Sequence, residues 1–173
     1  MDELKKYVKL QIDNIDIYTS VKVNGMKKRS TGEEEECMIR AFVETGTDGG
    51  WIADIKQSQG TLVFQEYLSN SCSLQKWICE ARLADVECIK FGFVGFDKQK
   101  PYIINIEEST ISNLEKYISF KHEDTYPVLK HIIDTLIKEE DGEYVLTKNA
   151  YTPLSLKLYK LPAKEEDDQE GEN

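Results

Sequence analysis

Apolar and polar residues alternate along the first part of the chain. Residues 7–12 and 15–23 place apolar side chains at alternate positions, interrupted only by Thr19, and Asp13-Asn14 separates them. A period of two is typical of a strand with one buried face, and Asp-Asn favours a turn. The pattern therefore predicts two N-terminal strands joined by a tight turn.

The stretch from Cys37 to Ile55 has two interpretations. We favour a hairpin, because both halves are rich in β-branched and aromatic residues and Thr45–Gly50 between them holds three glycines and an aspartate. In the alternative, a helix begins at Thr31, where Glu34 completes a capping box, and continues through Val43.

The remaining elements follow the same two periods. Apolar residues at helical spacing, such as Leu74, Trp77, Ile78 and Ala81, predict three helices, over residues 73–81, 111–118 and 124–137. Alternation and β-rich composition predict four further strands, over residues 86–96, 102–106, 144–147 and 153–161.

The order of these elements predicts an α+β fold. Strands and helices do not alternate strictly, so we expect a mainly antiparallel sheet of about six to eight strands covered by two or three helices. Apolar residues stop at Pro162. We therefore expect a single globular domain over residues 1–162 and a disordered acidic tail over residues 163–173.

The chain carries a formal net charge of −10 at pH 7. From Lys164 to the C-terminus six acids oppose one lysine, so this tail contributes −5 and the rest of the chain keeps −5. An acidic body disfavours non-specific nucleic-acid binding and favours a basic protein partner. The candidate partner-binding residues are the two acidic runs: Glu33, Glu34, Glu35, Glu36, Glu165, Glu166, Asp167 and Asp168.

No motif in the sequence indicates catalysis or cofactor binding. The chain has two histidines and four scattered cysteines, without the close pairs that bind zinc, and no glycine-rich loop leads into a Lys-Ser or Lys-Thr pair. We expect no metal, no cofactor and, on balance, no enzyme. No apolar window is long enough to span a membrane, so we expect a cytoplasmic location, in the producing or the host cell.

An aromatic platform is a second functional candidate. Phe91, Phe93 and Tyr102 lie on two strands of a predicted hairpin and could stack on single-stranded bases. Packing of these rings in the core is the favoured interpretation, because the hairpin carries only lysines at positions 90, 98 and 100 as basic residues.

The order of elements also resembles a known family. A strand at Trp51, a loop at Gly60-Thr61-Leu62, a helix near Ser73 and the hairpin over residues 89–106 are similar to the actin-depolymerising homology domain of the coactosin type. The resemblance covers roughly residues 35–145 and implies actin binding.

These observations together favour a binding protein without enzymatic activity. We expect it to act by surface complementarity on a basic protein, as an inhibitor, an immunity protein or a phage-type protein directed against a host or its defence. Single-strand nucleic-acid binding with the tail as a regulator, and actin binding, remain the two alternatives.

Overall fold

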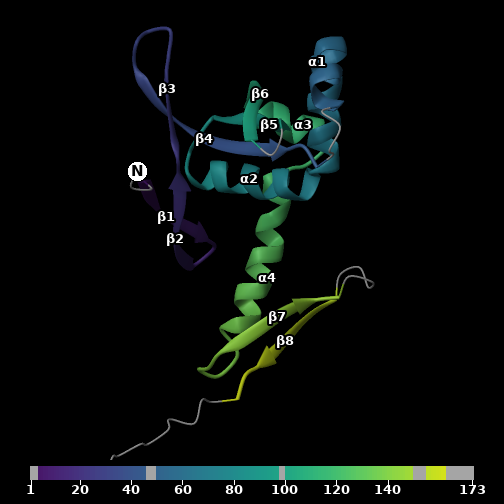
Figure 1. Ribbon diagram of the computed structural model, residues 1–173. Helices are drawn as coiled ribbons and strands as arrows, with labels where there is room; N and C mark the ends of the chain where they lie inside the picture. Colours follow the sequence, from purple (N-terminus) through teal and green to yellow (C-terminus); the bar gives the residue numbers. More distant parts are fainter. Residues whose placement is uncertain (1–3, 46–49, 98–99, 150–154, 163–173) are drawn as a thin grey trace, which may run out of the picture. The chain divides into compact units, whose positions relative to one another are not determined.

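A computed structural model of the chain describes residues 4–45, 50–97, 100–149 and 155–162 (Figure 1). The chain forms two compact units, residues 1–128 and residues 129–173, and each is described by itself. A single domain over residues 1–162 stays a prediction. The predicted disordered tail lies outside the described residues.

The first two strands form an antiparallel hairpin, as predicted. β1 (Leu4–Ile12) pairs with β2 (Ile15–Val23), and Asp13 in the turn has a φ of 53°, in the left-handed region that aspartate tolerates. Tyr18 in β2 is 74% exposed, whereas Val21 and Val23 at its end are buried. Only the end of this hairpin therefore contributes to the core.

A short hairpin follows, and it excludes the alternative in which a helix begins at Thr31. β3 (Gly25–Lys28) pairs antiparallel with β4 (Glu34–Val43), and Gly32 in the connecting turn has a φ of 88°. The capping-box alternative, which we did not favour, is wrong because residues 34–37 pair with β3. At Gly25 a Cβ atom would lie 2.8 Å from the Cys37 sulfur, so only glycine fits there.

The hairpin predicted over residues 37–55 is also wrong. Its first half is β4, but its second half begins α1 (Gly50–Ser69), which is followed by α2 (Ser71–Leu83). The Glu44 carboxylate after β4 accepts a hydrogen bond of 3.0 Å from the Trp51 backbone N–H, which satisfies a donor in the first turn of α1. The helix is interrupted at Ser58, where the backbone is extended. The residues before and after Ser58 therefore do not follow one continuous helical period.

The two helices connect β4 to β5 (Cys88–Asp97), which lies beside β4 in parallel. β5 then forms the predicted antiparallel hairpin with β6 (Lys100–Thr110), with a bulge after Phe93. The four-stranded sheet has the order β3-β4-β5-β6. α3 (Ile111–Tyr117) starts directly after β6, where the Thr110 hydroxyl accepts a hydrogen bond from the Asn113 N–H.

The last part of the chain contains the predicted helix and two strands. The short 3-10 helix η1 (His122–Thr125) precedes α4 (Tyr126–Leu136), in which every residue is described and none is buried. In the second unit β7 (Tyr144–Lys148) pairs antiparallel with β8 (Leu156–Lys160). The described strands number eight, in three sheets, and the predicted α+β class with mainly antiparallel strands is confirmed.

The core of the first unit lies between the four-stranded sheet and the helices α1, α2 and α3. The Phe42 ring in β4 has its centroid within 5.3–5.9 Å of four other aromatic rings, those of Tyr67, Trp77, Phe91 and Phe93. Helices α1, α2 and α3 contribute the apolar residues that cover these rings, among them Val63, Leu74, Ile78, Ala81, Ile111 and Leu114.

None of the helices in the described ranges is long and apolar enough to cross a membrane.

A partly buried ion cluster connects α2, α3 and η1. The Glu115 carboxylate in α3 lies 2.7 Å from the Arg82 guanidinium and 2.7 Å from the His122 imidazole, and its side chain is 15% exposed. Burial opposes its ionisation, but the hydrogen bonds from Arg82 and His122 outweigh burial and hold the pKa of Glu115 below its ordinary value. The cluster therefore stabilises the fold only while Glu115 is ionised.

The burial of β5 gives a first prediction. We expect Phe91→Ala to lower the free energy of unfolding by about 3–5 kcal/mol, because the deleted ring is fully buried among other rings. Phe96→Ala in the same strand removes a ring that is 47% exposed and should cost less than about 1 kcal/mol. Urea denaturation followed by far-UV circular dichroism measures both, and equal losses would contradict the assigned faces of β5.

A second prediction concerns acid stability. Because the pKa of Glu115 is lowered on folding, its contribution is present above its unfolded pKa and is lost as pH falls through its folded pKa. Between about pH 7 and about pH 3 the urea midpoint should fall more steeply for the unaltered chain than for Glu115→Gln.

The matched control for this prediction is Glu123→Gln. The Glu123 carboxylate lies 3.3 Å from the same imidazole but its side chain is 65% exposed, so this variant should follow the unaltered chain. Parallel curves for the unaltered chain and Glu115→Gln would show that the ion cluster does not control acid stability.

Candidate functional site

In the described part of the first unit, the face of the four-stranded sheet opposite the core keeps large apolar side chains exposed. Residues that point away from the core along β4, β5 and β6 include five large apolar side chains, each between 46% and 63% exposed: Ile39, Val43, Phe96, Ile103 and Ile106. We call this set the open face. A soluble domain seldom exposes so many large apolar groups on one sheet surface, and such patches are typical of binding sites.

A network of charges covers one end of the open face. The Lys27 ammonium in β3 lies 2.8 Å from Glu108 in β6 and 3.4 Å from Glu35 in β4, and Lys90 lies 3.6 Å from Glu108. The hydrogen bond from Lys27 to Glu108 raises the pKa of Lys27, which also contacts the Cys88 thiol. The network thus forms a polar border beside the apolar residues.

Two cysteines lie under this network and are fully buried. Cys37 and Cys88 stand on adjacent parallel strands, at most 1% exposed, and burial raises the pKa of each thiol. Neither is disulfide-bonded. Burial and a raised pKa both lower the reactivity of a thiol, so the two side chains serve here mainly in packing.

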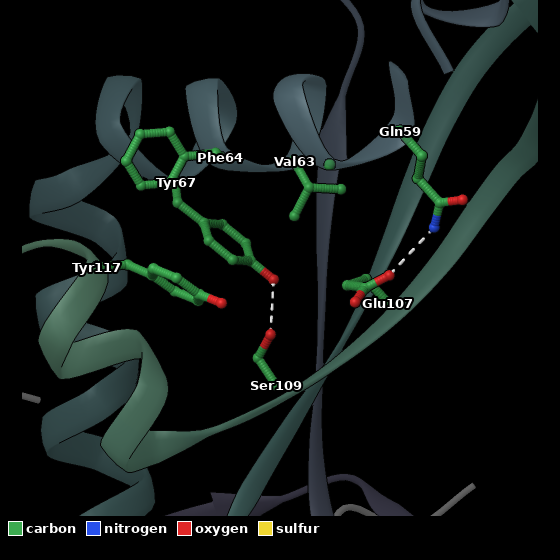
Figure 2. A pocket seen from close by; sticks show the side chains of 8 residues that line it. Gln59, Val63, Phe64, Tyr67, Glu107, Ser109 and Tyr117 are labelled. Carbon is green, nitrogen blue, oxygen red and sulfur yellow. Dashed lines mark hydrogen bonds between the residues drawn. The ribbon is translucent and has the colours of Figure 1, made fainter. Parts of the chain in front are cut away.

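A pocket of about 440 Å³ lies on the other side of β6, beneath α1. We call it the β6 pocket. Figure 2 shows side chains from α1, α3 and β6 converging on it: Gln59, Val63, Phe64, Tyr67, Glu107, Ser109 and Tyr117. Two of its rings, Phe64 and Tyr117, are 43% and 46% exposed, whereas Tyr67 is buried. The pocket is therefore open to solvent on its aromatic side.

Polar groups of the β6 pocket are held by two hydrogen bonds (Figure 2). The Tyr67 hydroxyl lies 3.0 Å from the Ser109 hydroxyl, and the Gln59 amide donates to the Glu107 carboxylate at 3.2 Å. Burial raises the pKa of Tyr67 to about 12, so the phenol stays neutral. These bonds orient the lining residues before any ligand binds.

Two of the four predicted acids at positions 33–36 form ion pairs, one within the β3–β4 hairpin and one with β1. Glu35 accepts hydrogen bonds from Arg29 at 2.7 and 2.9 Å, which lower its pKa to about 2, and Glu36 lies 3.1 Å from Lys6. Glu34 is exposed opposite Lys28, and Glu33 accepts a hydrogen bond from Thr31. The acids at positions 165–168 lie outside the described residues.

The aromatic platform is excluded by burial. Phe91 and Phe93 are both 0% exposed in the core, so neither ring can stack on a base. Tyr102 on β6 is half-buried and is separated from them by the bulge after Phe93. Core packing, the favoured interpretation of the two phenylalanines, is confirmed.

The residues that line the two surfaces were missed in the sequence. The isoleucines at positions 103, 104 and 106 place apolar side chains on both faces of β6. This pattern was the sequence feature that indicated a second apolar face of the sheet. No pattern relates Phe64 to Glu107 and Tyr117, which lie more than 40 residues later in the chain. In the described ranges, no group of three or more histidines, cysteines or acids could hold a metal ion.

Comparison with known proteins relates the chain to one protein family. The family model eIF-3_zeta, eukaryotic translation initiation factor 3 subunit 7, matches residues 3–160. The D-2 subunit of eukaryotic translation initiation factor 3 in Drosophila grimshawi is 26% identical over 170 residues, which are 92% of this chain and 30% of that protein. A subunit of the same factor in Schizosaccharomyces pombe is 27% identical over 159 residues, 86% of this chain and 28% of its own length. The chain thus spans less than a third of these relatives.

A solved structure shares the fold. The crystal structure of Scheffersomyces stipitis Rai1 in complex with (3'-NADP)+ and calcium ion aligns with a TM-score of 0.53, over 91% of this chain and 40% of that chain. The sequence identity is 12%, so the likeness concerns the fold alone.

These matches overturn the function predicted from charge. Translation initiation factors are neither phage-type inhibitors nor immunity proteins, so the predicted function is wrong. The predicted basic protein partner is wrong for the same reason. The nucleic-acid platform fails on the burial of Phe91 and Phe93. The actin-binding resemblance fails too, because residues 50–69 form α1, where it required a strand at Trp51 and a loop at Gly60.

The family match extends over nearly the whole chain and includes both compact units. The predicted cytoplasmic location is confirmed by it, because translation initiation factors act in the cytoplasm. On this evidence the chain belongs to the eIF-3 zeta family, the family of eukaryotic translation initiation factor 3 subunit 7.

Proposed function

We propose that the chain is a docking module in translation initiation and that its open face binds another component of eukaryotic translation initiation factor 3. The observation that carries this proposal is the open face itself, where Ile103 and Ile106 are 63% and 62% exposed on a regular strand. Burial of apolar surface is the main favourable term in protein association.

The arrangement of the open face supports a protein as its occupant. Its apolar residues lie on neighbouring strands of one rigid sheet, with the charge network of Lys27, Lys90 and Glu108 at one end. An apolar centre with a polar border is typical of protein interfaces. The bordering charges are already paired with one another, so the occupant needs an apolar surface and no excess of basic residues.

The family supports the choice of partner. The relatives in Drosophila grimshawi and Schizosaccharomyces pombe are named as subunits of initiation factor 3. A subunit works in contact with other polypeptides, and the open face offers five large exposed apolar side chains on one sheet surface for such a contact. We therefore assign it to a neighbouring polypeptide of that factor.

A binding experiment tests this proposal. Initiation factor 3 purified without its own member of this family is titrated into the labelled chain, and affinity is measured by fluorescence anisotropy. We expect Ile106→Glu and Ile103→Glu each to weaken binding at least tenfold, about 1.4 kcal/mol, because each places a charge in an apolar contact.

The control is Leu68→Glu in α1, a similar change at a residue that is 47% exposed and lies outside the open face. It should bind as the unaltered chain does. No binding of the unaltered chain, or equal losses in all three variants, would refute the proposal.

A further inference from the structure

The β6 pocket contains a carboxylate that has no cationic partner among the residues that the structure describes. Glu107 forms no ion pair with any described residue, and its side chain accepts one hydrogen bond, from the Gln59 amide at 3.2 Å. In contrast, the next acid along β6, Glu108, pairs with two lysines. Glu107 therefore keeps unused capacity to accept hydrogen bonds inside a pocket that is open to solvent.

The aromatic side of the pocket is built from three rings. The Phe64 and Tyr117 rings meet edge to face at 5.9 Å and 76°, and the Tyr67 and Tyr117 rings lie 6.1 Å apart (Figure 2). Phe64 and Tyr117 come from α1 and α3, so two helices hold them in place. Ring faces carry partial negative charge and attract cations within about 6 Å of their centres.

The two features together select the charge of a ligand. An apolar occupant would bury Glu107 with a single hydrogen bond from a neutral amide, which is costly. An anion would be repelled by the carboxylate. A cation satisfies the carboxylate and is attracted by the ring faces of Phe64 and Tyr117.

Among cations, a guanidinium fits these residues best. It is planar, it is weakly hydrated, it stacks on aromatic rings, and it donates several hydrogen bonds in one plane. The lysine ammonium is compact and strongly hydrated, and it gains less from an aromatic wall. We infer that the β6 pocket binds the guanidinium of an arginine side chain from a protein partner, with Glu107 as its acceptor and Phe64 and Tyr117 as its aromatic wall.

The position of the pocket suits a polypeptide. β6 is an outer strand of the four-stranded sheet, so within the described ranges no strand covers its free edge. An extended segment that approaches such an edge can place a side chain in an adjoining pocket. The site lies on the helix-covered side of the sheet, and the inference does not depend on the docking function proposed for the open face.

The test uses the full chain and small probes. N-acetyl-arginine methylamide is titrated into the isotope-labelled chain, and backbone amide shifts are followed by NMR. We expect saturable shifts at Ser109, Tyr117 and the Gln59 side chain. The citrulline analogue, which keeps the shape without the charge, should bind at least about tenfold more weakly, and so should the lysine analogue.

Two variants separate a guanidinium site from a simple crevice. Glu107→Gln preserves the size of the side chain and should lower the affinity for the arginine probe at least about tenfold. The matched control, Glu108→Gln, changes the neighbouring acid on the opposite face of β6 and should leave the affinity unchanged. Spectra of both variants without a probe verify that each is folded.

The inference is overturned by any of three results. The first is a citrulline or lysine analogue that binds as tightly as the arginine probe. The second is an unchanged affinity in folded Glu107→Gln. The third is the absence of any shift at the pocket residues.

Discussion

The parallel pairing of β4 with β5 is the constraint on which the rest of the first unit depends. Parallel neighbours cannot be joined by a tight turn, so the chain must cross from the end of β4 to the start of β5 over one face of the sheet. The crossing consists of α1 and α2, and their apolar residues cover Phe42, Phe91 and Phe93. The aromatic core is the direct result of this connection.

The same connection leaves two surfaces for binding. Because α1 and α2 lie on one side, the opposite side of β4, β5 and β6 keeps its apolar residues exposed. Because α1 extends over the outer strand β6 while α3 starts at the end of that strand, their side chains enclose the β6 pocket. The two sites thus share β6, whose alternate residues face opposite sides of the sheet.

Charge misled the functional prediction for a local reason. Net charge counts acids without regard to their partners, and in the β3–β4 hairpin Glu34 and Glu35 stand directly opposite two lysines, at positions 28 and 27. Glu115 and Glu108 are likewise paired in the described structure. Glu107, the carboxylate of the β6 pocket, is one of many acids in the sequence. Only the side chains around it in the folded protein distinguish it from the others.

The sequence by itself determined the local elements. Its periods of two and of 3.6 residues located the N-terminal hairpin, the β5–β6 hairpin and the helices α2, α3 and α4, because each depends on contacts between near neighbours in the chain. Only the tertiary structure decided that residues 50–69 form a helix and that β4 pairs with β5. The helix packs on the core through Trp51 against Phe93 and Tyr67 against Phe91. The strands pack through Phe42 against Phe91 and Phe93, about 50 residues away. Contacts between residues so far apart in the chain leave no local pattern.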